Sequence, residues 1–254
     1  MEQVTPALVL IFGRAVDPGL ILYATAVLFF AYLVRGIAGF GSGLIAVPLL
    51  SLAFPLTSVV PMVVALDYIG SFGQGAKNLE RIIWKEQFAL VPFMLIGISL
   101  GFFVFWAIPS SVLSKMLGGF VIVYAVYQLL SLPSLGTSKW IAAACGVFGG
   151  LVGTLFGTGG PFYVMYFSVR NLNKDAFRAT FAANFMIDGG IRLVSYFVVG
   201  LLGFETLACV LVALPIIVAG LYLGGRIHTG LSQQSFARIV NILLLGSGTI
   251  VLLR

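Results

Sequence analysis

Residues 35–48 read Arg35-Gly36-Ile37-Ala38-Gly39-Phe40-Gly41-Ser42-Gly43-Leu44-Ile45-Ala46-Val47-Pro48, a glycine-rich interruption inside a long apolar run. The second half of the chain holds a related interruption, Gly149-Gly150-Leu151-Val152-Gly153-Thr154-Leu155-Phe156-Gly157-Thr158-Gly159-Gly160-Pro161. Hydrocarbon cannot satisfy the backbone N–H and C=O groups that such an interruption exposes, so each must lie within protein or line a cavity. Two related interruptions predict one shared site.

The composition indicates a membrane protein. Hydrophobic residues make up 60% of the 254 residues, and the mean hydropathy is +1.12. Only 9% of the residues are charged, against about a quarter in soluble domains. The formal charge is +6, but the basic residues occur singly or in short loops rather than gathered as a nucleic-acid binder requires. We therefore predict a polytopic membrane protein that has the lipid bilayer, and no nucleic acid, as its partner.

Catalytic and metal-binding patterns are missing from the sequence. Cys145 and Cys209 lie in apolar segments without CxxC spacing, and His228 is the only histidine, which argues against a disulfide, a metal site or a serine–histidine–aspartate triad. Residues 39–43 lack the Lys-Ser/Thr ending of a nucleotide-binding loop. Residues 1–17 lack the pattern of a cleaved signal peptide. We expect a protein that is not an enzyme and has no cofactor.

Ten apolar runs predict an all-α polytopic membrane fold. They cover about residues 20–38, 42–54, 57–76, 87–108, 112–132, 140–156, 160–169, 177–200, 205–225 and 235–253. A helix needs about 20 residues to span a bilayer, so the second and seventh runs are too short. We interpret them as half-helices that return from the interruptions.

The two halves are predicted to be copies of one unit. Gly41 matches Gly157, Asp67 matches Asp188 and Lys115 matches Arg238, with offsets that drift only from 116 to 123 residues. Weak internal similarity of this kind is typical of transporters. We divide the chain into an N-terminal segment (1–18), repeat 1 (19–132), a linker (133–139) and repeat 2 (140–254). Each repeat is expected to hold a glycine-broken re-entrant or short helix pair and three full transmembrane helices.

Loop charges favour an inverted arrangement of the repeats. If each half crosses the membrane an odd number of times, one side collects the basic residues Lys77, Arg81, Lys85, Lys139, Arg170, Lys174 and Arg226. The positive-inside rule then makes that side cytoplasmic and places both termini outside. A single broken crossing in each half would instead divide the basic loops evenly. Inversion would bring the two interruptions together near the membrane midplane; alternatively, the glycines serve only close helix packing.

Two aspartates within the runs are candidates for coupling transport to protons. Asp67 and Asp188 lie in the middle of their runs, and Arg192 follows Asp188 by four residues, which places both on one helix face. A neighbouring cation holds a carboxylate ionised, so Asp67, without such a neighbour within one turn, is the better proton carrier. Both aspartates could instead be structural hydrogen-bond acceptors.

The interruptions also predict an anion site. Arg35 could hold an anion with its forked guanidinium, or only extend to a lipid headgroup. Freed backbone N–H groups at the starts of the half-helices would add to it, as would the Ser42 and Thr158 hydroxyls. The candidate substrate-binding residues are Arg35, Gly41, Ser42, Gly43, Gly157, Thr158, Gly159, Gly160, Asn184 and Arg192, with Gln74 and Tyr163 as further lining.

Residues 39–48 and 153–161 resemble the paired glycine motifs of the sulfite exporter TauE/SafE family, and the resemblance extends from about residue 19 to residue 253. The chain departs from the commoner motif at Phe40, Ser42 and Pro161. The resemblance implies a carrier in the cell inner membrane for a small anion such as sulfite, thiosulfate or an organosulfonate, driven by protons or the membrane potential. An anion channel and a non-catalytic membrane accessory subunit are the alternatives.

Overall fold

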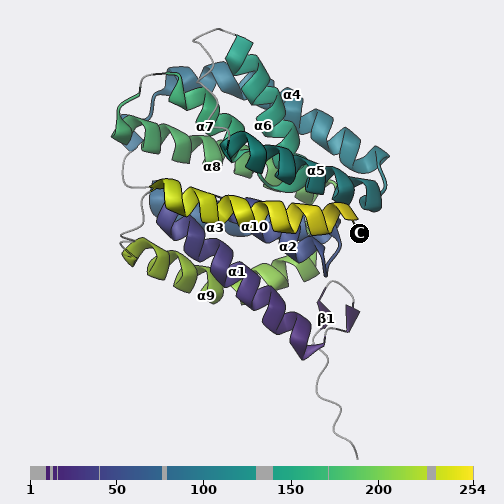
Figure 1. Cartoon of the computed structure of the whole chain (residues 1–254). Coiled ribbons are helices and arrows are strands. Elements are labelled where there is room, and N and C mark those ends of the chain that lie inside the picture. The colour runs from purple at the N-terminus through teal and green to yellow at the C-terminus, as the bar shows by residue number, and fades with distance from the viewer. Residues whose placement is uncertain are drawn as a thin grey trace, which may run out of the picture.

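The computed structural model describes residues 10–11, 14–15, 17–39, 41–75, 79–129, 140–170, 172–227 and 233–253 (Figure 1). The α-helices in these residues are α1 (Pro18–Ala38), α2 (Ser42–Ser51), α3 (Leu56–Gly75), α4 (Trp84–Ala107), α5 (Ser110–Leu129), α6 (Trp140–Phe156), α7 (Gly160–Ser168), α8 (Lys174–Val198), α9 (Phe204–Arg226) and α10 (Gln233–Leu253). A 3-10 turn, η1 (Leu79–Arg81), precedes α4. Two short strands, β1 (Leu10–Ile11) and β2 (Arg14–Ala15), pair antiparallel before α1.

All ten predicted apolar runs are confirmed as helices. The second and seventh are short as predicted, since α2 has 10 residues and α7 has 9. Proline inside α2, α3, α4 and α9 does not end these helices. The predicted linker at 133–139, Phe40 and His228 lie outside the described residues, as does most of the N-terminal segment. Cys145 is buried and Cys209 half-buried, and both are free thiols.

The outer surface is that of a polytopic membrane protein. Large apolar side chains point outward, including Trp106, Phe204 and Leu253, which are 88%, 87% and 82% exposed. Four of the described helices, α1, α4, α5 and α9, are both long and apolar enough to cross a membrane. Helix α8 is longer than any of these, at 25 residues, but it carries charged side chains along its length. The two charged side chains in its middle, Asp188 and Arg192, are buried in the protein, as charges within a membrane protein usually are.

Helix pairs from the two halves of the chain pack against each other. The most extensive contacts join α4 to α6, α1 to α9, α5 to α10 and α3 to α8. In Figure 1, α1 and α9 lie at one end of the molecule and α4 and α6 at the other, with α2, α3 and α10 between them. Glycine permits this proximity: a Cβ on Gly150 would lie 2.3 Å from the carbonyl oxygen of Met94. Close packing through small residues replaces the hydrophobic effect, which cannot drive association in lipid.

Candidate functional site

Left-handed glycines make both interruptions. Gly39 caps α1 with φ of 84°, donating its N–H to the carbonyl of Arg35 at 2.6 Å, and Gly41 precedes α2 with φ of 99°. Gly157 follows α6 with φ of 69°. A residue with a Cβ is strained in this region of φ, so glycine is what allows each helix to stop and the next to start within a few residues. The breaks bring α2 and α7 back into the protein interior.

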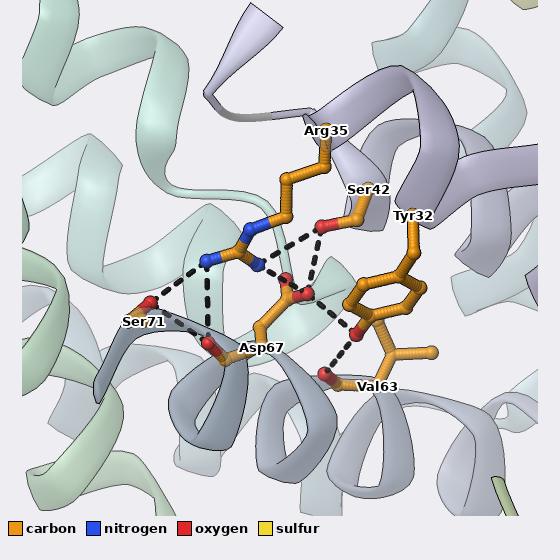
Figure 2. Close-up of polar contacts among 6 residues, drawn as sticks. All are labelled: Tyr32, Arg35, Ser42, Val63, Asp67 and Ser71. Carbon is orange, nitrogen blue, oxygen red and sulfur yellow. Dashed lines mark hydrogen bonds and ion pairs between the residues drawn. The ribbon is translucent and has the colours of Figure 1, made fainter. Parts of the chain in front are cut away.

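The first interruption leads into a buried cluster around Asp67 of α3 (Figure 2). One carboxylate oxygen, Oδ1, lies 2.6 Å from the guanidinium Nη1 of Arg35. The same oxygen accepts hydrogen bonds from the Tyr32 hydroxyl at 2.6 Å and the Ser42 hydroxyl at 2.7 Å. Arg35 also donates to the Ser71 hydroxyl at 2.7 Å. Three side chains from α1 and α2 thus contact one carboxylate, and Ser71 of α3 accepts from the arginine.

This geometry changes two expectations about Arg35 and Asp67. Arg35 is only 3% exposed, so it does not extend to a lipid headgroup. Asp67 has an arginine partner after all, supplied by α1 rather than by its own helix. The prediction that Asp67 differs from Asp188 in lacking a cation was therefore wrong. Neighbours within one helical turn could not reveal a partner that lies 32 residues earlier in the chain.

The second interruption leads into a matching cluster around Asp188 of α8. Asp188 and Arg192 form the ion pair predicted from their spacing, with side chains that are 1% and 3% exposed. The Tyr163 hydroxyl of α7 donates to Asp188 at 3.0 Å, and Arg192 donates to the carbonyl of Gly153 at 2.5 Å. The Tyr196 hydroxyl donates to the adjacent Thr154 carbonyl at 2.6 Å. These hydrogen bonds hold α8 against the C-terminal end of α6, just before the break.

The two clusters contain the same chemical groups on different helices. Each has a buried aspartate, arginine and tyrosine. The arginine comes from α1 in the first cluster and from α8 in the second, and the position that matches Arg192 at the Asp67–Asp188 offset is Ser71. Ser71 nevertheless contacts the Arg35 guanidinium. In both halves an arginine thus neutralises the aspartate, as burial of a charge requires.

The two interruptions meet at one small cavity. Its volume is about 10 Å³, and its walls are Arg35, Gly41, Ser42, Gly43, Leu44, Asp67, Gly157, Thr158, Gly160, Pro161 and Phe185. A Cβ on Gly43 would lie 2.8 Å from the carbonyl oxygen of Gly157, so the breaks are in direct backbone contact. The Thr158 hydroxyl is buried and has no hydrogen-bond partner among the described residues. Space of this size suits about one water molecule.

The structure thus gathers seven of the ten candidate binding residues around this cavity. Gly159, Asn184 and Arg192 are not among its walls. Gly159 instead packs on α6, where a Cβ would lie 2.4 Å from the carbonyl oxygen of Gly149, which is the packing role considered above. The Gln74 side chain lies outside the described residues.

Sequence reasoning missed Tyr32, Ser71 and Phe185. Two signals could have found the first two. Tyr32 precedes Arg35 by three residues and Ser71 follows Asp67 by four, so each shares a helix face with a candidate residue. Phe185 precedes Asp188 by three residues, but an apolar side chain does not stand out in an apolar run.

The described residues around the cavity present hydrogen-bond donors of the kind that suit a small polar solute. Within the described residues, no group of three or more histidine, cysteine, aspartate or glutamate side chains could hold a metal ion. Arg35 and the two hydroxyls are hydrogen-bond donors without an activated nucleophile. A buried site with charged side chains at the centre of an apolar helical protein is typical of membrane transporters.

Comparison with known proteins identifies the family within that class. Residues 24–251 match the family described as sulfite exporter TauE/SafE. The chain belongs to this family, whose members are transporters and not enzymes. It is 24% identical over 191 residues to the probable inner membrane transporter protein TsaS of Comamonas testosteroni, covering 74% of this chain and 80% of that protein. It is 25% identical over 227 residues to the probable sulfite/organosulfonate exporter TauE of Cupriavidus necator, covering 85% and 88%. No solved structure matches the chain.

Proposed function

We propose that this protein is a secondary transporter in the inner membrane that moves a small sulfur-containing anion, such as sulfite, thiosulfate or an organosulfonate, by alternating access. The observation that carries the proposal is the meeting of both interruptions at one buried cavity beside Arg35, Ser42 and Thr158. The name of the Cupriavidus necator relative supports the choice of anion. Export is the direction that the family description favours.

The donors around the cavity suit an oxyanion. Arg35 can present two N–H groups to two oxygens, and the Ser42 and Thr158 hydroxyls can each donate one hydrogen bond. The first backbone N–H groups of α2 and α7 have no partner within their helices and carry the positive end of the helix dipole. Helix dipoles that point at a bound anion are a recurring feature of transporter sites.

The cavity is too small for the proposed substrate in this conformation. At about 10 Å³ the cavity has room for about one water molecule, and sulfite or a sulfonate is larger. Because Gly43 touches Gly157, α2 and α7 must separate before an anion fits. We assign this conformation to an occluded state between the two open ones.

The helix contacts support two related repeats at 19–132 and 140–254, and the inverted orientation rests on the loop charges. Exchanging α1–α5 with α6–α10 turns the α4 contact with α6 into the contact of α9 with α1, and it turns the α3 contact with α9 into that of α8 with α4. The contacts of α3 with α8 and of α5 with α10 map onto themselves. This is the pattern expected of two related halves about a pseudo-two-fold axis. The loop charges then put both termini outside.

The ion pairs suggest how protons are coupled to transport. Asp67 occupies the Arg35 guanidinium that the anion needs, so the carboxylate acts as an internal competitor. A proton on Asp67 would cancel this competition and let the anion replace it on Arg35. Asp188 and Arg192 have the same relation in the other half and form the second proposed coupling site. Proton and anion would then cross together, and the outward gradient of the anion would supply the energy for export.

Flux measurements in proteoliposomes test the proposal. We expect saturable flux of sulfite, thiosulfate or a sulfonate, stimulated by a pH gradient, and stabilisation of the detergent-solubilised protein by the same anion. Arg35→Gln should abolish both effects, whereas Arg226→Gln should retain them because Arg226 is exposed and contacts only the Tyr222 ring in the described residues. Failure of all three anions to move or to stabilise the protein would reject the substrate class. Non-saturating flux with unitary conductance steps would indicate an anion channel.

A further inference from the structure

A buried row of polar side chains runs along α8. Thr180, Asn184, Asp188 and Arg192 follow one another at intervals of four residues, which places them on one helix face. Thr180, Asn184 and Asp188 have no exposed surface, and Arg192 is 3% exposed. The last two form the cluster beside the second interruption. The first two have no place in that cluster.

The start of α4 extends this row. The Ile83 N–H donates to the Thr180 hydroxyl at 3.0 Å, and the Gln87 amide donates to the Thr180 carbonyl at 2.6 Å. Gln87 is 1% exposed. Gln87 lies one turn beyond Ile83 on α4, and Asn184 lies one turn beyond Thr180 on α8. Each of the two segments therefore carries an amide side chain one turn after the contact between Ile83 and Thr180.

These amides are not satisfied. Neither amide atom of Asn184 has a hydrogen-bond partner among the described residues, and the same holds for the Gln87 oxygen. A buried polar group without a partner costs about 1–3 kcal/mol. A purely structural position would favour an apolar residue of the same size, so the amides are suited to partners from outside the chain, such as water or a solute.

The matching face of α3 is apolar. At the Asp67–Asp188 offset, Thr180 matches Val59 and Asn184 matches Val63. Both valines are fully buried. The polar row therefore leads away from the central region in one direction only, toward the first residues of α8.

Charged residues surround that end of α8. Arg81 of η1 pairs with Asp175, and both side chains are more than half exposed. Glu86 of α4 pairs with Arg170 at 3.2 Å. Phe185, the neighbour of Asn184, belongs to the wall of the central cavity. Along α8, Thr180 and Asn184 thus lie between this charged surface and Phe185 of the cavity wall.

We propose that Gln87, Thr180 and Asn184 form a second, peripheral site that binds water and the transported oxyanion on its way between the central cavity and the surface at the start of α8. The Asn184 amide nitrogen can donate to an oxyanion oxygen, and the Gln87 oxygen can accept from water. The matching positions of α3 are valines, so the other half has no equivalent site. This inference rests on the proposed transport of an oxyanion.

Cysteine accessibility tests the site without requiring transport. In a full-length protein with Cys145→Ala and Cys209→Ala, reconstituted in liposomes, Asn184→Cys should react with the anionic thiol reagent methanethiosulfonate ethylsulfonate, applied to both faces. Val63→Cys is the matched control. We expect Asn184→Cys to react at least about tenfold faster, a difference of about 1.4 kcal/mol in activation free energy. Equal rates, or faster reaction at Val63→Cys, would overturn the proposal.

Flux measurements separate this proposal from the proposed function. Asn184→Leu should melt no lower than the wild-type protein and still be stabilised by sulfite, but carry at least about tenfold less sulfite per folded molecule, a change of about 1.4 kcal/mol. The control is Asn241→Leu, because Asn241 is 2% exposed and its side-chain oxygen also has no partner among the described residues. If the wild-type protein transports sulfite and Asn184→Leu transports it equally well, the peripheral site is rejected and the proposed function is not. Absence of wild-type flux would reject the proposed function. The cysteine labelling rates would then still test whether the peripheral site exists.

Discussion

At the scale of single residues, the chemistry centres on one oxygen atom. Asp67 Oδ1 meets Tyr32, Arg35 and Ser42 at 2.6–2.7 Å. Such an arrangement satisfies a buried carboxylate, but it also withholds the guanidinium from any other anion. Competition between Asp67 and the substrate for Arg35 is the physical basis of the proposed coupling, and it leads to two predictions.

The first prediction concerns the charge of Asp67. Asp67→Asn keeps the shape of the side chain but removes the competing charge, so we expect anion binding to remain and stimulation by a pH gradient to disappear. The measurement is flux with and without the gradient, together with anion-induced thermal stabilisation. Asp175→Asn is the control, because Asp175 is an exposed partner of Arg81. A variant of Asp67 that still responded to the gradient would exclude this residue from coupling.

The second prediction concerns the ion pair as a unit. Arg35→Leu leaves the Asp67 charge buried without its partner, which costs about 3–5 kcal/mol in free energy of unfolding. Adding Asp67→Leu should recover most of that loss, since an apolar pair can replace a buried ion pair. Thermal melting in detergent measures both. If the double variant is as unstable as the single one, the pair does not act as a unit.

At the scale of elements, the broken helices depend on glycine for two separate reasons. Gly39, Gly41 and Gly157 adopt positive φ, whereas Gly43 permits contact with the opposite break. Only the second role links one half of the chain to the other. The length of α2 and α7 follows from the breaks, but their meeting depends on the absence of one Cβ.

The prediction at this scale is that Gly43→Ala impairs transport. The added Cβ would lie 2.8 Å from the Gly157 carbonyl oxygen. Overpacking of this kind forces shifts in the structure that lower the free energy of unfolding by about 1–3 kcal/mol. We expect a lower melting temperature and loss of anion flux. Gly119→Ala is the control, because nothing lies within 4 Å of the added atom. Normal flux in Gly43→Ala would show that contact between the breaks is not required.

At the scale of the whole molecule, two ion pairs join the halves at the start of α4 and α8. Arg81 and Glu86 come from the first half, and their partners Asp175 and Arg170 come from the second. The Tyr166 hydroxyl also donates to Glu86 at 2.5 Å. If one half rocks against the other, these contacts must break when this end opens.

We therefore predict that Glu86→Gln favours opening of this end. Loss of one charge weakens a partly buried contact by about 1 kcal/mol, which corresponds to about a fivefold shift in population. Spin labels across the opening, placed on exposed residues of α4 and α8, would measure that shift. Arg81→Gln should act less, because exposed pairs contribute about 0–1 kcal/mol. A larger effect of Arg81→Gln would contradict this ranking.

Local patterns predicted much of this protein. Helix positions followed from the runs of apolar residues, because a segment in lipid must satisfy its own backbone hydrogen bonds. The Asp188–Arg192 pair followed from a spacing of four residues. The same method failed for Asp67, whose partner Arg35 comes from another helix, and for Tyr32, which donates to the same carboxylate.

The sequence by itself determined the membrane environment, the ten helices, the two glycine breaks and the family. Each depends on composition, on spacing within one helix or on a local motif, and needs no knowledge of how helices pack. Only the tertiary structure decided that Arg35 neutralises Asp67, that Gly43 touches Gly157, and that Asn184 lies outside the cavity. These facts depend on which helices become neighbours, because helices packed in lipid are selected by close contact and polar satisfaction between distant parts of the chain.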